Sequence, residues 1–271
     1  MKNTSATSGP TKTVLITGAG SGLGLRLAEL YGERGNAVIA LDLRLSSAVR
    51  TRLQAATSGR VHVEEVDVRN GADVVAATDR GVATFGGLNL VVNCAGVQQA
   101  AVFDELPEEA FRRIVDINLV GSRNVAAATL RHLGVGGHLV LIASMAGLVP
   151  NYSYAAYCAS KYGVVGLAEV LRLERHPDRV DVSVVCPPEV DTPMVAEERE
   201  TMLAPTRALK EMAGTLELES AVRQIITGID ERTFMIIPGR RARFTALLTK
   251  ILPKRVLHLV SDRVVTRELA I

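Results

Sequence analysis

The stretch Thr13-Val-Leu-Ile-Thr17-Gly18-Ala-Gly20-Ser-Gly22-Leu-Gly24 decides the fold. An apolar strand leads into a turn rich in glycine, and a helical pattern follows with Leu23, Leu27 and Leu30 on one face. This order is the context in which a glycine motif indicates nucleotide binding, because the backbone N–H groups and the helix N-terminus can approach a pyrophosphate. Without that context, such a glycine string is often only a flexible turn.

Six further apolar runs of strand length follow. They are unbroken and rich in Val, Ile and Leu, as expected for parallel strands that are covered on both faces. The seven expected strands are 13–17, 37–41, 61–66, 88–93, 138–143, 180–185 and 234–237, and helical stretches include 23–34, 72–85, 107–133 and 153–175. This alternation predicts an α/β fold, a single-domain Rossmann-type doubly wound parallel sheet of about seven strands with helices on both faces.

Length, net charge and local composition indicate how the chain is organised, and they give no indication of a nucleic-acid partner. The chain has 271 residues and a net charge of +2, so nothing global indicates a nucleic-acid partner. Residues 1–12 are polar and lack the apolar core of a secretory signal, which predicts a disordered leader. No apolar run is long enough to span a bilayer, so a cytoplasmic location is expected. Residues 13–239 are expected to form the main domain, while the loop 187–216 and the tail 240–271 lie outside the alternation.

Tyr157 and Lys161 lie one helical turn apart in Tyr154-Ala-Ala-Tyr157-Cys-Ala-Ser-Lys161, so a phenol and an ammonium share one face. A free tyrosine ionises near pKa ~10, and a neighbouring cation stabilises the phenolate. The pair could therefore act as a reversible acid and base. Tyr154 has no lysine four residues later, so the register is unambiguous.

Ser144 lies thirteen residues before Tyr157, and Asn118 lies further upstream. Together with the TGxxxGxG turn and Asn93-Cys-Ala-Gly96, this order of Asn, Ser, Tyr and Lys resembles the short-chain dehydrogenases/reductases of the compact type. The resemblance runs from about Thr13 to Pro193 and, weakly, to Pro238. It implies the fold just described and the interconversion of an alcohol and a ketone, with hydride transfer to or from a nicotinamide cofactor.

The resemblance also implies a role for each member of the tetrad. Tyr157 would exchange a proton with the substrate oxygen, and Ser144 would hold that oxygen. Lys161 would lower the tyrosine pKa and bind the nicotinamide ribose, and Asn118 would hold a water that links Lys161 to solvent. The alternative for Asn118 is a helix-interior side chain bonded to a backbone carbonyl.

Asp42, at the end of the second strand, favours NAD over NADP as the cofactor. Its carboxylate can accept hydrogen bonds from ribose hydroxyls and would repel a 2′-phosphate. The lack of a basic residue at Ala19 or Ser21 agrees, whereas Arg44 could bind a phosphate and Asp42 could be a simple turn residue. The full set of expected cofactor residues is Gly18, Gly20, Ser21, Gly22, Leu23, Gly24, Asp42, Leu43, Asp67, Val68, Asn93, Ala95, Gly96, Tyr157, Lys161, Pro187, Val190 and Thr192.

The substrate mouth is expected beyond the carboxyl ends of the strands. The expected substrate residues are Gln98, Ser144, Met145, Tyr154, Tyr157 and Met194. Pro188 replaces a glycine usual in the family and is expected to reshape this loop. The segment from Pro187 to Glu198 is similar to the 3-ketodihydrosphingosine reductases, which suggests a hydrophobic, lipid- or steroid-like substrate. Those reductases generally use NADPH, which conflicts with Asp42.

Acidic residues of this loop, Glu189, Asp191, Glu197 and Glu198, are expected to keep it solvated, and no metal site is expected because no histidine accompanies them at ligand spacing. A non-catalytic, NAD(H)-binding sensor is a second hypothesis, which the intact tetrad disfavours. A homodimer or homotetramer, paired through helices 107–133 and 153–175, is expected from the resemblance.

The tail 240–271 combines an apolar stripe with basic residues. The stripe comprises Phe244, Leu247, Leu248, Ile251 and Leu252 and continues beyond Pro253, and it is expected to be buried somewhere. A basic amphipathic pair of helices can lie on an anionic membrane, which predicts possible peripheral membrane contact. A cap over the active site and a dimer contact are the alternatives.

Overall fold

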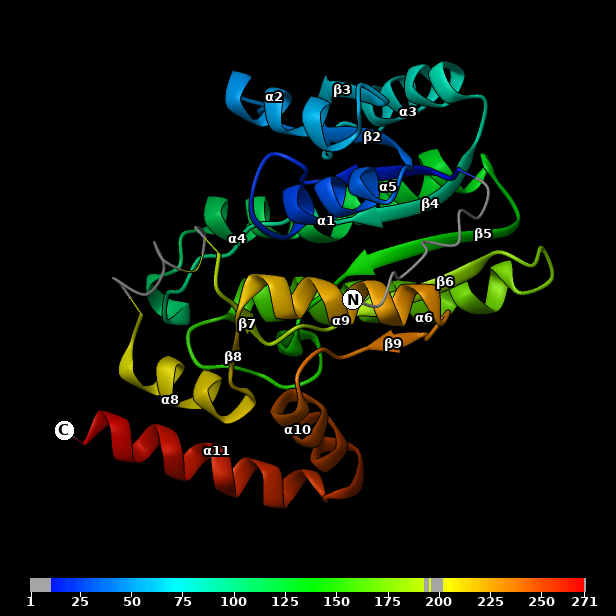
Figure 1. The fold of residues 1–271 in the computed structure, drawn as a ribbon. Coiled ribbons are helices and arrows are strands. Elements are labelled where there is room, and N and C mark those ends of the chain that lie inside the picture. Colours follow the sequence, from blue (N-terminus) through cyan, green and yellow to red (C-terminus); the bar gives the residue numbers. More distant parts are fainter. Residues whose placement is uncertain (1–10, 193–194, 196–201, 271) are drawn as a thin grey trace, which may run out of the picture.

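The computed structural model describes residues 11–192, 195 and 202–270, so the expected leader 1–12 lies outside it except for Thr11 and Lys12. A seven-stranded parallel sheet forms the centre, in the order β3-β2-β1-β4-β5-β6-β9 (Figure 1). Its strands are β1 (Thr13–Thr17), β2 (Ala37–Asp42), β3 (Val61–Glu65), β4 (Leu88–Asn93), β5 (Leu133–Ile142), β6 (Asp181–Val185) and β9 (Met235–Ile236). The predicted fold class is confirmed.

Helices cover both faces of the sheet. They are α1 (Gly22–Glu33), α2 (Ser47–Ala56), α3 (Gly71–Phe85), α4 (Glu108–Val115), α5 (Gly121–Leu130), α6 (Ala155–Arg175), α8 (Ala204–Ala213), α9 (Leu218–Asp230), α10 (Arg240–Ile251) and α11 (Lys254–Leu269). Helices α3, α5 and α6 pack on one face, and α1, α2 and α9 pack on the other. A small second sheet pairs β7 (Glu189–Val190) with β8 (Thr215–Leu216).

The two helical layers explain why the strands are apolar without alternation. Successive side chains of a strand point to opposite faces of the sheet. In β1, Leu15 packs against the layer that contains α3, whereas Val14 and Ile16 pack against the layer that contains α1. Every position of a central strand is therefore buried, which is the pattern that the sequence shows.

Two expected elements differ from the structure. The helix expected at 107–133 contains a π-helical segment, Asp116–Val120, between α4 and α5, and its last expected residue, Leu133, begins β5. The strand expected at 138–143 thus starts five residues earlier, and its pairing with β4 shifts register between Leu88 and Leu90. Neither irregularity has a signal in the hydrophobic pattern, which records burial and not backbone hydrogen bonding.

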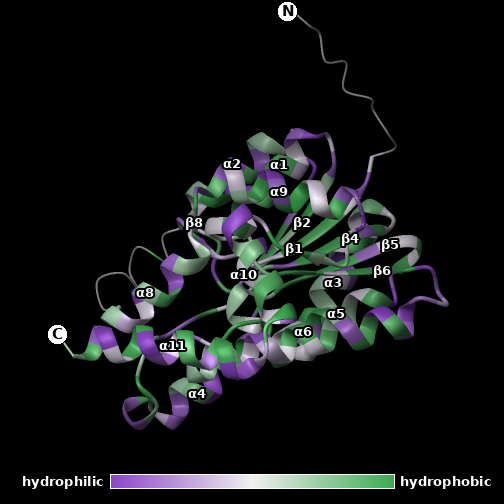
Figure 2. Cartoon of the chain, turned by 90° about the horizontal axis from the view of Figure 1, so that it is seen from below, coloured by the Kyte–Doolittle hydropathy of each residue, from purple (hydrophilic) through white to green (hydrophobic). Residues whose placement is uncertain are grey.

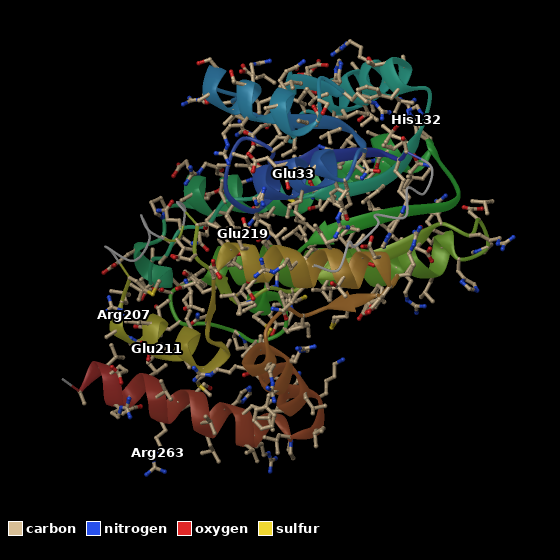
Figure 3. All side chains as sticks on the ribbon, viewed as in Figure 1. Glu33, His132, Arg207, Glu211, Glu219 and Arg263 are labelled. Carbon is tan, nitrogen blue, oxygen red and sulfur yellow. The ribbon has the colours of Figure 1, made fainter. Side chains whose placement is uncertain are left out.

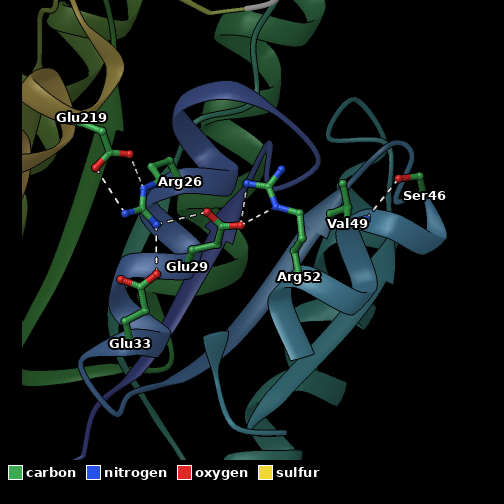
Figure 4. Close-up of polar contacts among 7 residues, drawn as sticks. All are labelled: Arg26, Glu29, Glu33, Ser46, Val49, Arg52 and Glu219. Carbon is green, nitrogen blue, oxygen red and sulfur yellow. Dashed lines mark hydrogen bonds and ion pairs between the residues drawn. The ribbon is translucent and has the colours of Figure 1, made fainter. Parts of the chain in front are cut away.

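A charged network joins three helices on the α1 face (Figure 4). Arg26 on α1 contacts Glu219 on α9 at 2.5 Å and Glu33 at 3.1 Å, and Arg52 on α2 contacts the buried Glu29 at 2.7 Å. The Arg26 guanidinium holds the pKa of the Glu219 carboxyl below its usual range. This network fixes α1, whose N-terminus follows the glycine turn, relative to α2 and α9.

The tail forms two helices at the end of the molecule that lies away from β2 and β3 (Figure 1). Helix α10 packs through Ala242 and Ala246 against Met145, and α11 packs against α8 without a fully buried residue. Phe244, Leu247 and Ile251 of the apolar stripe are exposed, so this chain by itself does not bury them, and their expected burial stays a prediction. Among the described helices, none is long and apolar enough to cross a bilayer.

His138 should make the fold sensitive to acid. It is buried in β5, its Nε2 lies 2.7 Å from Ser183 Oγ, and burial lowers its pKa from 6.5 to about 3. The unfolded chain therefore binds a proton between these values that the folded chain does not, so stability falls as the pH drops from about 6.5 towards 3. We expect a loss of up to ~1.4 kcal/mol per pH unit.

Urea unfolding of the wild type and of His138→Leu at pH 7 and pH 5 measures this contribution. The variant should lose less stability between the two pH values. An equal loss in both proteins would show that other groups cause the acid sensitivity.

Candidate active site

A cavity of about 1030 Å³ opens beyond the carboxyl ends of the strands. The predicted site residues that line it are Gly18, Ser21, Leu23, Gly24, Asp42, Leu43, Asp67, Val68, Ala95, Gly96, Gln98, Ser144, Met145, Tyr154, Tyr157, Lys161, Pro187, Val190 and Thr192. Gly20, Gly22, Asn93 and Asn118 do not line it, and Met194 lies outside the described residues. The fold thus brings together residues from both halves of the chain.

The glycine turn is closed so tightly that two positions exclude a side chain. A Cβ at Gly24 would lie 2.1 Å from the Gly18 carbonyl oxygen, and a Cβ at Gly20 would lie 2.9 Å from the Asp42 carboxyl. Gly18 adopts a φ of +67°, which favours glycine. These close contacts leave a cradle of backbone at the N-terminus of α1, which fits a pyrophosphate.

Asp42 lies at the end of β2 and is partly buried. Its carboxylate accepts hydrogen bonds from Gly20 N–H at 2.8 Å and from Arg44 N–H at 3.1 Å. The carboxylate is thereby held at the edge of the cavity, where its other lone pairs can receive hydroxyl donors. The Arg44 side chain is exposed and is not among the residues that line the cavity.

Asn93 supports the sheet and does not line the cavity. Its side chain accepts from Thr17 Oγ1 at 2.5 Å and donates to Ser122 Oγ at 2.8 Å, so it ties β1 and β4 to α5. Asp67, which does line the cavity, is paired with Arg69, and that guanidinium lowers the pKa of the carboxyl.

Lys161 is held inside the site by its surroundings. Its Nζ donates to the Ile142 carbonyl at 2.9 Å and lies 5.6 Å from the centre of the Tyr157 ring. A Cβ at Gly96 would come within 3.4 Å of this nitrogen, so the backbone there approaches the ammonium closely. Burial lowers the pKa of Lys161 from 10.5 to about 8.

Asn118 lies in the π-helical segment, and protein groups bind both amide protons of its side chain and one lone pair of its oxygen. Its Oδ1 accepts from Val97 N–H at 2.8 Å, and its Nδ2 donates to Val97 O and to Ser160 Oγ, both at 2.9 Å. This geometry agrees with the structural alternative for the side chain, because no amide proton is left for another acceptor. Single π-helical turns often occur at functional sites.

Ser144 and Tyr157 meet at the wall of the cavity. Ser144 follows β5, and its Oγ accepts from Ala146 N–H at 3.1 Å. Burial is the largest influence on the Tyr157 phenol and raises its pKa, while a hydrogen bond with Ser144 and the charge of Lys210 act in the opposite direction. Lys161 was expected to lower this pKa, but in the chain alone the net shift is upward, because the loss of hydration outweighs the opposing influences.

Lys210 is the site residue that the sequence did not reveal. It extends from α8, and its Nζ donates to Tyr154 Oη at 3.1 Å and forms an ion pair with Glu189 at 2.9 Å. The Tyr154 and Tyr157 rings contact each other at 5.5 Å between centroids. The Glu189 side chain is only 7% exposed, so the expectation that it solvates the loop was wrong. The partners of Lys210 are 21 and 56 residues away, too far for any local pattern to connect them.

Replacing Lys210 by Met should reduce the fraction of Tyr157 that is deprotonated at a given pH. Loss of this charge raises the pKa of Tyr157, so the rise of kcat/KM with pH for alcohol oxidation should move to higher pH. Lys210→Arg keeps the charge and should restore the position of the profile. Lys12→Met, at the amino end of β1, serves as the matched control. A profile unchanged in Lys210→Met would contradict this electrostatic role.

The rest of the cavity is largely apolar. Its wall is completed by Val149, which lies between β5 and α6, and by residues from the loop, α8 and the tail, namely Val195, Leu209, Phe244, Leu248, Leu252 and Leu257. The sequence placed the loop 187–216 and the tail 240–271 outside the strand and helix alternation, but it did not show which of their side chains face inward. In the part of the chain that the structure describes, no three His, Cys, Asp or Glu residues are grouped so as to hold a metal ion.

The fold and the glycine cradle define a doubly wound α/β protein of the Rossmann type. Residues 12–203 match the family model described as short chain dehydrogenase. The chain belongs to this short-chain dehydrogenase family, and the resemblance inferred from the sequence is confirmed.

Individual relatives agree with this assignment. An uncharacterized short-chain type dehydrogenase/reductase of Sinorhizobium fredii is 33% identical over 88% of this chain and 40% of its own length. The cyclohexanol dehydrogenase of an Acinetobacter strain is 30% identical over 83% of this chain and 90% of its own. A short chain dehydrogenase from Mycobacterium paratuberculosis, solved bound to NAD, has a TM-score of 0.73 and 26% identity over 83% of this chain and 94% of that one. The chain thus spans less than half the length of the first relative.

Proposed function

We propose that this chain is an NAD(H)-dependent oxidoreductase that interconverts a secondary alcohol and a ketone on a hydrophobic, lipid- or steroid-like substrate. The observation that carries the proposal is the meeting of Ser144, Tyr157 and Lys161 in a cavity whose lining is largely apolar. The glycine cradle and Asp42 fit the pyrophosphate and adenosine ribose of a dinucleotide. The solved relative that contains NAD agrees with this cofactor.

Each polar residue has a defined task at the substrate oxygen. Bound NAD would supply the hydride acceptor at its nicotinamide ring. Tyr157 Oη takes the alcohol proton during oxidation and returns it during reduction, and Ser144 Oγ holds the same oxygen. The Lys161 ammonium favours the phenolate and sits where it can bind ribose hydroxyls. Thr192 and Val190 would contact the nicotinamide side of the cavity.

The test is NADH formation with a panel of secondary alcohols that includes cyclohexanol, sterols, 3-hydroxyacyl chains and long-chain bases. We expect turnover with NAD for at least one apolar member of the panel. Proven NAD binding with no turnover across the panel would favour the second candidate, a non-catalytic NAD(H)-binding sensor.

The alternative function is an NADPH-dependent 3-keto lipid reductase. A substitution of Asp42 distinguishes it from the NAD-dependent enzyme by the cofactor that is preferred. Asp42→Ala removes the charged acceptor, so KM for NAD should rise by about 10- to 100-fold and the preference should move towards NADP. Asp42→Asn keeps the shape of the side chain, so its KM for NAD should lie between the values of the wild type and of Asp42→Ala. If the wild type prefers NADP, or if Asp42→Ala leaves the NAD to NADP ratio unchanged, the NAD assignment is wrong.

We also propose a homodimer or homotetramer, paired through α4, α5 and α6, in the cytoplasm. Exposed apolar side chains on α6, namely Tyr162, Val170 and Leu173, support this pairing because a helix face of this kind is usually covered. Light scattering of the purified chain measures the mass directly. A monomer at micromolar concentration would contradict the proposal.

A further inference from the structure

The two tail helices leave a surface that the rest of the chain does not cover. We define the tail surface by its exposed apolar side chains, Phe244, Leu247, Ile251, Val256, Leu259, Val260 and Leu269, and by the exposed basic residues around them. Ile251 is 66% exposed and Leu259 is 70% exposed. Apolar side chains clustered on a surface indicate an interaction site.

Helix α10 has two distinct faces. Ala242 and Ala246 pack against the body of the protein, whereas Phe244, Leu247 and Ile251, spaced by three and four residues, lie along the opposite face. Arg243 and Lys250 are exposed on the same helix. An apolar spine flanked by cations is typical of a helix that lies in the interface of a membrane.

Helix α11 repeats this mixture of exposed groups. Hydrophilic and hydrophobic residues intermix along its length (Figure 2), and Arg263 is directed away from the body of the protein (Figure 3). Arg255 and Leu259 lie one turn apart and are both exposed. Both tail helices lie at the same end of the molecule (Figure 1).

The charge of the chain is divided unequally. Residues 240–271 contain eight Lys or Arg and two Asp or Glu, a net charge of +6, while the whole chain carries +2, so residues 1–239 carry −4. Two copies that met through the tail surface would bring like charges together, which disfavours that contact. An anionic bilayer, by contrast, attracts basic segments and accepts apolar side chains.

The same helices border the active-site cavity. Leu248 and Leu252 at the end of α10, and Leu257 and Val260 on α11, line it, while neighbouring residues point outward. A protein that rests on its tail surface would therefore present the wall of the cavity to the bilayer. A hydrophobic substrate could then enter without crossing water.

We propose that the tail surface docks on an anionic lipid bilayer and that the cavity opens towards it. Docking stands without any turnover, whereas the entry of substrate from the bilayer rests on the proposed function. The partner is a lipid surface with negatively charged headgroups, because the surface offers exposed cations and apolar side chains together.

Flotation of the purified full chain with vesicles tests the docking. We expect binding to vesicles of phosphatidylcholine and phosphatidylglycerol, and binding at least about tenfold weaker to phosphatidylcholine alone or at high salt. The pair Arg255→Gln and Arg263→Gln should weaken binding about tenfold or more. The pair Ile251→Ser and Leu259→Ser should weaken it as well, and the matched control Arg179→Gln with Arg223→Gln should not. None of these six residues lines the cavity.

Three results would overturn the proposal. They are no binding to anionic vesicles, equal binding to both kinds of vesicle, and a dimer that the Ile251→Ser and Leu259→Ser pair dissociates in light scattering. Oxidation of a small secondary alcohol such as cyclohexanol in solution separates the two proposals. Unchanged turnover in all variants leaves the proposed function intact whatever the vesicles show, and absent turnover in the wild type leaves docking unaffected.

Discussion

Tyr157→Phe is expected to reduce turnover by about 10²- to 10⁴-fold, because we propose that the phenol exchanges a proton with the substrate oxygen. Phenylalanine keeps the ring, so the edge contact with Tyr154 and the packing of α6 remain. NAD binding should change little, since the cradle and Asp42 lie on other elements. The rate of NADH formation at saturating substrate measures the first effect, and thermal shift with and without NAD measures the second.

Tyr154→Phe is the matched control for this substitution. Tyr154 also lines the cavity, but no lysine follows it one helical turn later. Its Oη accepts a hydrogen bond from Lys210. Its loss should cost less than about tenfold in rate. A Tyr157→Phe protein that retains turnover, or a Tyr154→Phe protein that is equally impaired, would assign the proton transfer to another group.

Lys161→Met should be nearly as damaging to turnover, by about 10²-fold or more, because we propose that the buried ammonium favours the phenolate and binds the nicotinamide ribose. The same substitution should change how the free energy of unfolding depends on pH. The pKa of Lys161 falls from 10.5 to about 8 on folding. Between these values the unfolded chain binds a proton that the folded chain lacks, so the free energy of unfolding of the wild type rises with pH.

This rise, on the order of 1 kcal/mol per pH unit, should be absent in Lys161→Met. Urea unfolding at pH 7.5 and pH 10 compares the two proteins, and Lys12→Met controls for the loss of an ordinary exposed lysine. If Lys161→Met strongly lowered the free energy of unfolding at pH 7.5, its loss of activity would follow from a disrupted α6, and the lysine would be a structural residue. Turnover close to that of the wild type would contradict its assigned role.

The sheet could be predicted from the sequence because strands that are buried on both faces appear as unbroken apolar runs. Seven apolar runs and the glycine turn before α1 located the strands of the sheet to within a few residues, and their order along the chain identified the topology. The start of β5 and the π-helical segment Asp116–Val120 escaped this reasoning. They depend on hydrogen bonds between backbone groups, which any side chain permits.

Some residues of the candidate site could be predicted from local spacing, and others could not. Tyr157 and Lys161 are one turn apart on a single helix, so their spacing alone indicated that they act together. Lys210 is paired with Tyr154 and Glu189, residues that come close only after α8 folds back over the sheet. A contact between distant segments has no signature in one sequence.

The sequence by itself determined the doubly wound class, because the periodicity of burial records it. It also predicted the cradle for a dinucleotide and the pair Tyr157 and Lys161 from short-range spacing, and Ser144 from the family resemblance. Only the tertiary structure decided the balance of forces on the Tyr157 proton, the burial of Glu189, and which side of the tail faces outward. These properties depend on how much water is removed from a group and on which charges replace it. That environment is built by segments that meet only when the chain is folded.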